Sequence, residues 1–347
     1  MKFQKNVIAT LNKCYSIAPL TYQGNPCFLV AAEKQDPCLL FDMEGRLLTT
    51  VFEEPGGVMS MVPLPWEEGA FLATHRFYSP NDSANASIVR VYPGQDGFQV
   101  QTLARLPFVH RFDILTRNHI HYLIACTLKS GHQYKDDWSS PGKVYATVLP
   151  EDLSAVTEEH PLKLTVLKDH MLKNHGYYRI TKDGYDSALV SSDEGVFLFT
   201  PPETPEGDFS ITQLLDTPAS DAVLVDLDGD GEEELFVFSP FHGDQILIYK
   251  KEHGSYFLQY THPVKTEFTH ALWAGSLNGR KVVLAGHRKG KRELLLFSYS
   301  SETAHYTYEV VDTDCGPANV SCFSTDKGPR IIAANREINE IAMYLPI

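Results

Sequence analysis

Histidines recur at equivalent places along this chain, and their side chains are the first candidates for chemistry. Of the 14 histidines, His110, His175 and His270 fall at the start of a recurring predicted strand, and His75 and His287 fall at the end of the next strand. Neutral imidazoles that converge from several strands suit zinc or another first-row metal such as manganese, and they can equally serve as general acids and bases near neutral pH. The alternative for each histidine is a hydrogen-bonded polar residue without a chemical role.

Two long polar inserts, over residues 75–86 and 129–143, are predicted to lie on the same face as these histidines. Long loops in a compact repeat protein are often functional, and aromatic rings beside charged groups suit the binding of a sugar. The candidate acids and bases are Tyr134, Asp136 and Asp137, and the candidate substrate-binding residues are Lys129, His132, Lys135 and Trp138, together with His75, His242, His287 and Arg336. The alternative is a lid that only packs against itself.

A third candidate is an acidic loop of the type that binds cations. Its carboxylates alternate with small residues and a glycine allows a tight turn: Asp226, Asp228, Asp230, Gly231, Glu232 and Glu234. Calcium needs several oxygen ligands around such a turn, and magnesium also prefers oxygen. The loop therefore predicts a structural calcium or magnesium site. The alternative is an Asp/Gly-rich turn that holds no ion.

The elements that must position these residues form a repeat. A short apolar run that ends in small residues occurs in seven copies, such as 27–32, 122–127 and 330–335, and each is followed by a second β-type run. The mean period of about 50 residues is typical of propeller blades with four strands. We therefore predict an all-β, seven-bladed β-propeller of four-stranded antiparallel blades, in one domain over residues 1–347. The last copy lacks an outer strand, and the strand predicted at about 3–11 can supply it and close the ring.

Two family resemblances follow from local motifs. The acidic loop at 226–234 resembles the FG-GAP (or VCBS) repeat of β-propellers, in which this loop joins the first two strands of a blade. The segments 174–178 and 186–202 look like the propeller of aldos-2-ulose dehydratases, and the pattern of His110, His175 and His270 is similar too. The second resemblance implies metal-dependent elimination of water from an oxidised sugar such as anhydrofructose, with those three histidines as metal ligands or acid/base groups.

Composition narrows the function classes. The net charge of −14 disfavours binding to nucleic acid. No apolar run is long enough to span a membrane, and the N-terminus lacks the apolar region of a secretory signal. The six cysteines are scattered without a Cys-x-x-Cys pair and are expected to be free thiols. These features predict a cytoplasmic protein, although a trimmed secretion signal would leave the same chain. Nucleotide-binding motifs are absent, and the oligomeric state stays open.

The histidines favour a metal-dependent lyase, a dehydratase or isomerase that acts on an oxidised sugar at the mouth of the propeller channel. The first alternative is a non-catalytic propeller that binds a glycan or a protein. The second is a lactonase-type hydrolase, which would need an oxygen-rich calcium site at the centre. We rank that hydrolase last because the predicted mouth is rich in imidazole.

Overall fold

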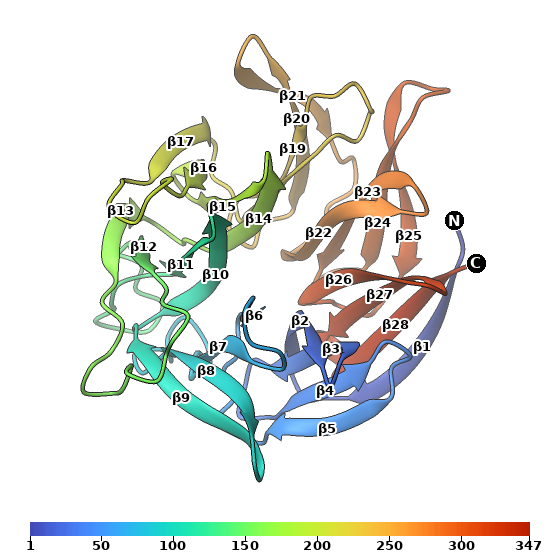
Figure 1. Cartoon of the computed structure of the whole chain (residues 1–347). Coiled ribbons are helices and arrows are strands. Elements are labelled where there is room, and N and C mark those ends of the chain that lie inside the picture. Colours follow the sequence, from blue (N-terminus) through green and yellow to red (C-terminus); the bar gives the residue numbers. More distant parts are fainter.

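The computed structural model describes residues 1–347 as seven four-stranded antiparallel sheets around a central channel (Figure 1). The predicted seven-bladed β-propeller is confirmed. Each blade is numbered here by its order around the ring, and its strands are given from the innermost to the outermost. Blades 1 to 4 contain β2 (Cys14–Tyr22), β3 (Asn25–Ala32), β4 (Cys38–Asp42), β5 (Leu47–Phe52); β6 (Met61–Pro63), β7 (Phe71–His75), β8 (Ser87–Gly94), β9 (Gly97–Arg105); β10 (Val109–Arg117), β11 (Ile120–Thr127), β12 (Gly142–Val148), β13 (Thr165–Met171); and β14 (Gly176–Lys182), β15 (Tyr185–Ser192), β16 (Gly195–Thr200), β17 (Ser210–Leu215).

The remaining three blades complete the ring. They contain β18 (Asp221–Val225), β19 (Glu234–Ser239), β20 (Gln245–Glu252), β21 (Ser255–Thr261); β22 (Thr269–Leu277), β23 (Arg280–His287), β24 (Leu294–Ser300), β25 (His305–Asp312); and β26 (Asn319–Thr325), β27 (Gly328–Asn335), β28 (Glu340–Pro346), β1 (Phe3–Thr10). A single 3₁₀ turn, η1 (Arg336–Ile338), precedes β28. The structure contains no helix that is long and apolar enough to cross a membrane.

Ring closure follows the sequence prediction. The N-terminal strand β1 pairs antiparallel with β28, from Phe3 opposite Pro346 to Thr10 opposite Glu340. The last blade is therefore built from both ends of the chain, and its three C-terminal strands gain an outer partner. This pairing covers an edge of the sheet that an open array would expose.

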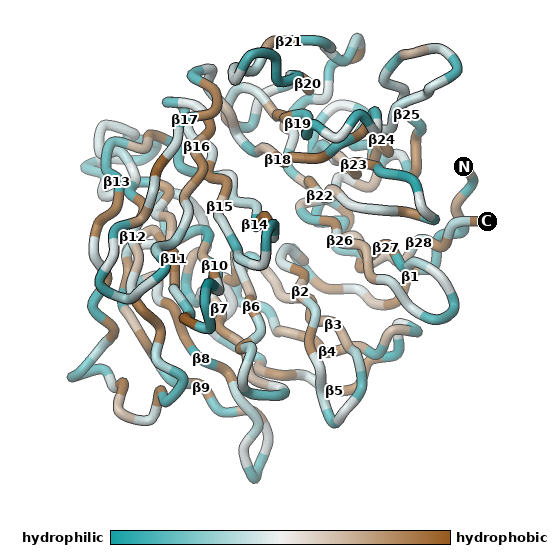
Figure 2. The backbone as a smooth tube through the Cα atoms, turned by 45° about the horizontal axis from the view of Figure 1, so that its top comes forward, coloured by the Kyte–Doolittle hydropathy of each residue, from teal (hydrophilic) through white to brown (hydrophobic).

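The core lies between neighbouring blades. The second strand of each blade is covered on both faces over its central residues, which form an apolar run. In β19 every residue is buried, and residues 235–238 are apolar. The outer strands have one face in solvent, and most of β21 is exposed. Hydrophobic stretches run along strands such as β8 and β18, whereas many connecting loops are hydrophilic (Figure 2).

Two features of the blades position the site. Inner strands of adjacent blades contact one another around the channel, and they all begin on the face where the second strands end. We call this face the mouth. At the start of β2, β10 and β22 the register to the second strand shifts by one residue, at Tyr15, His110 and His270. A shift of this kind is what a β-bulge produces, and bulges re-aim side chains.

Candidate functional site

Seven equivalent positions surround the mouth, one at the start of each inner strand. They are occupied by Tyr15, Ser60, His110, His175, Ser220, His270 and Ala318. The alignment of His110, His175 and His270 that was inferred from the sequence is thus reproduced in space. His75 and His287 end β7 and β23, as expected, on the same face.

Four imidazoles meet at this mouth, and we call His110, His175, His242 and His270 the imidazole cluster. One nitrogen from each of His175, His242 and His270 lies within 4.8 Å of the others. The Nε2 atoms of His175 and His242 are 3.3 Å apart. The ring of His110 lies 4.7 Å from that of His175, measured between centroids. His242 reaches the cluster from the turn between β19 and β20, a position that the sequence assigned to substrate binding.

Hydrogen bonds orient two of the imidazoles. Nδ1 of His270 lies 2.7 Å from the carbonyl oxygen of Ala318, and Nδ1 of His175 lies 3.0 Å from a carboxylate oxygen of Asp221. Nδ1 donates to these oxygens, so in its neutral form each ring carries its lone pair on Nε2. Both Nε2 atoms face the cluster. This arrangement resembles that of metal-binding histidines, whose second nitrogen is held by a carbonyl or a carboxylate.

A close backbone approach allows the contact between His175 and Asp221. A side chain at Gly176 would place its Cβ 2.6 Å from the carbonyl oxygen of Ser220 and 2.7 Å from Cα of Asp221. Only glycine fits between β14 and β18 at this point. The two inner strands can therefore bring the buried imidazole and the carboxylate together.

The surroundings keep most of the cluster uncharged. Burial lowers the pKa of His110, His242 and His270 well below the usual range, and the positive charges of Arg111 and, for the last two, Arg288 lower it further. His110 and His270 are buried, and His242 is half-buried. These rings are neutral at pH 7, which is the form that binds metals.

Tyr15 is the site residue that the sequence reasoning missed. Its hydroxyl lies 3.1 Å from Nε2 of His270 and 3.5 Å from Nε2 of His110. Burial raises the pKa of this phenol, so it stays protonated and can donate. Tyr15 precedes His110 by 95 residues, the same separation that links His175 to His270. That spacing was available in the sequence, but an alignment restricted to histidines does not find it.

Aromatic and cationic side chains surround His242. The rings of Phe241 and Phe268 stack on it, with centroid distances of 3.9 and 4.1 Å. The guanidinium of Arg288 lies 4.7 Å from the centroid of Phe268, and the ammonium of Lys289 lies 5.2 Å from it. The stacking fixes the plane of the half-buried imidazole at the entrance.

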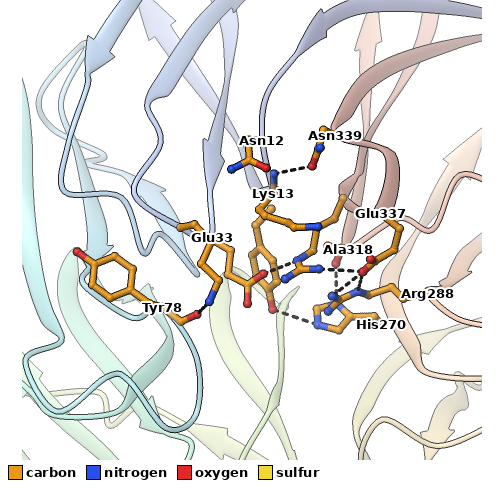
Figure 3. Close-up of polar contacts among 12 residues, drawn as sticks. Asn12, Lys13, Glu33, Tyr78, His270, Arg288, Ala318, Glu337 and Asn339 are labelled. Atoms are coloured by element: carbon orange, nitrogen blue, oxygen red, sulfur yellow. Dashed lines mark hydrogen bonds and ion pairs between the residues drawn. The ribbon is translucent and has the colours of Figure 1, made fainter.

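An ion-pair network borders the cluster (Figure 3). Arg288 binds Glu337 at 2.7 Å, and Arg336 binds both Glu337, at 2.9 Å, and Glu33. Burial opposes ionisation of Glu337, but the two guanidiniums prevail and lower the pKa of its carboxyl. Arg336, predicted to bind substrate, is therefore engaged with two carboxylates of the protein.

Beneath the cluster the channel holds a cavity of about 270 Å³. Ten of its 19 lining residues are hydrophobic, and the polar ones include Arg111, Asp113, Arg179, Asp221 and His270. Asp113 lies 3.5 Å from Arg179. A mostly apolar lining with a few charged groups is typical of sites that orient a small ligand.

The long insert at 129–143 packs largely on itself. Lys129 is fully buried, and its ammonium donates to the carbonyl oxygen of Asp137 at 3.1 Å and to the side-chain oxygen of Asn81 at 3.3 Å. The carboxylate of Asp137 accepts hydrogen bonds from two backbone amides of the same loop, those of Gln133 and Ser139. These contacts favour the lid alternative for both residues.

Other residues of the insert lie at its surface or at its border with the mouth. Asp136 accepts a hydrogen bond from Asn81 at 2.8 Å, and Tyr134 and Lys135 are exposed. His132 packs edge-on against Phe108. Trp138 is the insert residue that reaches the cluster's surroundings, because its ring lies 5.4 Å from that of Phe241.

Two predicted histidines lie outside the cluster. His75 is buried against the ring of Phe52, at a centroid distance of 4.8 Å. His287 contacts the loop that follows β23: its Nδ1 lies 2.9 Å from the carbonyl oxygen of Lys289, and its Nε2 accepts from the amide of Glu293. These contacts favour the alternative in which both side chains pack locally, and substrate binding by either stays a prediction.

The acidic loop lies between β18 and β19, on the face opposite the mouth. The carboxylates of Asp228 and Asp230 both bind the ammonium of Lys250, the latter at 2.6 Å. Asp226 accepts from the amides of Gly229 and Gly231, and Glu234 accepts from the amide of Leu227. Glu232 is exposed at the tip. Lys250 thus pairs with two of the carboxylates, while one oxygen from each of Asp226, Asp228 and Glu234 lies within 4.8 Å of the others. The calcium or magnesium site stays a prediction.

Comparisons with known proteins show the fold. No protein-family model matches the sequence, and no curated protein matches it. A streptogramin B lyase structure is 14% identical and has a TM-score of 0.57, with 99% of this chain and 98% of that chain covered. A putative 6-phosphogluconolactonase from Bacteroides uniformis is 14% identical, with a TM-score of 0.54 and coverage of 95% and 91%. One from Bacteroides fragilis is 11% identical, with a TM-score of 0.53 and coverage of 93% and 88%. These similarities show neither an FG-GAP repeat nor an aldos-2-ulose dehydratase.

Proposed function

We propose that this propeller is a metal-dependent lyase that eliminates water from an oxidised sugar at the channel mouth. His175, His242 and His270 would bind a divalent transition metal, zinc or manganese. The observation that carries the proposal is the approach of their three nitrogens to within 4.8 Å of one another, with Nδ1 of His175 and His270 held by protein oxygens.

The donor set suits such an ion. Three neutral imidazoles are typical ligands of zinc and related metals, and catalytic sites with three protein ligands leave a position for substrate. His242 is half-buried, so this side of the three nitrogens is open to a substrate. When bound, the metal would polarise the carbonyl oxygen of the sugar and acidify the neighbouring C–H bond.

The chain's own residues supply the proton transfers in this proposal. His110 is neutral at pH 7 and accepts the proton from the carbon next to the carbonyl. Tyr15 donates its proton to the departing hydroxyl, the C–O bond breaks, and an unsaturated ketone and water are released. Their side chains are 3.5 Å apart, so His110 can return its proton to the phenolate and reset the site.

The other predicted residues take different roles. Phe241 and Trp138 form an aromatic wall for the sugar at the entrance. We assign Lys129, Asp137, His75 and His287 to packing, and the acidic loop to a turn in which Lys250 pairs with Asp228 and Asp230. All six cysteines are unpaired, which fits the cytoplasmic location we propose.

The experiment is an elimination assay on keto-sugars with protein stripped by a chelator and reloaded with zinc or manganese. We expect an unsaturated ketone to form, detected by its ultraviolet absorbance, only after reloading. His175→Ala should abolish the product, whereas His287→Ala serves as the matched control that retains it. Metal-bound protein that converts no keto-sugar would contradict the lyase. Glycan binding that persists without metal would instead support the non-catalytic alternative.

A further inference from the structure

The charges around the imidazole cluster are unlike those of the whole chain. The protein has a net charge of −14, yet three of its cations lower the pKa of His242 through their positive charge: Arg288, Lys289 and Arg111. Arg288 is neutralised by Glu337. Lys289 is exposed to solvent, which screens its charge.

Arg111 is the exception, because it is half-buried and forms no ion pair. Its guanidinium forms one hydrogen bond, in which Nη1 donates to the carbonyl oxygen of Met59 at 2.5 Å. The guanidinium also lies 5.6 Å from the centroid of the Tyr15 ring. A guanidinium has five N–H donors arranged to grip two oxygens of one anion. Most of the donors of Arg111 are therefore available to a ligand.

Arg111 and the proposed metal site face the same space. Arg111 and His270 both line the channel cavity of about 270 Å³. On that wall Asp113 pairs with the guanidinium of Arg179, and the carboxylate of Asp221 accepts a hydrogen bond from the imidazole of His175. Against this one remaining carboxylate, a divalent ion and Arg111 would together bring three positive charges. Charge that is partly shielded from water needs a counter-charge.

We propose that the substrate is an acidic sugar and that Arg111 binds its anionic group, a carboxylate or a phosphate, within the channel. This inference rests on the lyase function and names its substrate class. The anion would supply the missing counter-charge, and its contact with Arg111 would hold the sugar with its carbonyl toward the histidines. A neutral sugar would leave two of these three positive charges without a counter-charge.

The test compares a neutral keto-sugar with its carboxylate and phosphate derivatives on metal-loaded protein, and it measures kcat/KM for each. We expect the wild type to prefer one acidic derivative by about ten- to a hundredfold, the range expected for a hydrogen bond to a charged group. Arg111→Gln should remove most of that preference, and Arg111→Lys should keep part of it. Arg292→Gln is the control, because that arginine pairs with Asp314 on the surface at 2.9 Å.

Direct binding keeps the proposal falsifiable if turnover is slow. Gluconate and inorganic phosphate, titrated calorimetrically into metal-loaded protein, distinguish the two anions. Equal use of neutral and acidic sugars by the wild type, or an unchanged preference in folded Arg111→Gln, would overturn the inference. Failure to bind metal or to convert any sugar would overturn the lyase function instead, and anion binding lost in Arg111→Gln would still support the role of Arg111.

Discussion

Replacing Asp221 by asparagine should weaken metal binding without altering any proposed ligand. The carboxylate lies 3.0 Å from Nδ1 of His175, and both side chains are buried. The substitution removes a charge-assisted hydrogen bond, worth about 1.5–3 kcal/mol. An amide that presents its NH₂ group to Nδ1 also favours the tautomer with a proton on Nε2, the atom needed for the metal.

The expected loss in zinc affinity is about tenfold, at the lower end of the ten- to hundredfold range for partners of metal ligands. The lower end applies because the carbonyl oxygen of Ser220, 3.3 Å from the same Nδ1, can still accept a hydrogen bond. Competition against a chromogenic chelator measures the affinity. Asp314→Asn is the control, since its carboxylate pairs with Arg292 at the surface. Equal zinc affinity in the folded Asp221→Asn protein and the wild type would refute this orientation of His175.

Three further predictions concern stability. Burial lowers the pKa of His75 from 6.5 to about 4. As the pH falls, this imidazole is therefore protonated in the unfolded chain before it is protonated in the folded protein. The stability that is present above pH 6.5 is lost as the pH falls toward 4. When the pH is lowered from about 7.5 to 5, the free energy of unfolding measured with urea should fall by about 2 kcal/mol more in the wild type than in His75→Phe. Equal decreases in the two proteins would contradict this prediction. Calcium should not change the Tm, whereas Lys250→Ala should cost about 1 kcal/mol; a Tm that rises with calcium concentration would show that the acidic loop binds the ion. Deleting residues 1–10 should lower the Tm and promote association through the uncovered edge of β28, measured by thermal unfolding and sedimentation; a monomer of unchanged Tm would argue against closure by β1.

The blade architecture could be predicted because the burial of each strand determines its pattern of apolar and polar residues. Strands such as β19 are covered on both faces, and their central residues, 235–238 in β19, are all apolar. In the outer strands apolar and polar residues alternate, or most residues are polar. The order of strands within a blade can therefore also be predicted from the sequence. The missing strand of the last copy then required the N-terminal segment as its partner.

The site was only partly predictable, because spacing gives a position along a strand but not the direction of a turn. His110, His175 and His270 were found through their equivalent places at the mouth. His242 lies in a turn, and its approach to His175 depends on how that turn folds over the cluster. Tyr15 occupies an equivalent place but differs in residue type.

Two lysines show what local motifs leave out. Lys129 was expected to contact substrate, yet it is buried because Asn81, from the other insert, and Asp137 satisfy its ammonium. Lys250 belongs to β20, beside the acidic loop, and strand pairing brings it to the carboxylates. Neither contact is visible in the spacing of a single motif.

Metal content by mass spectrometry tests the central claim most directly. Protein washed with chelator, reloaded with zinc or manganese and desalted should hold about one ion per chain. His242→Ala should lose that ion, and His75→Phe should retain it. No transition metal in the reloaded wild type, or equal content in His242→Ala, would contradict a metal site formed by His175, His242 and His270.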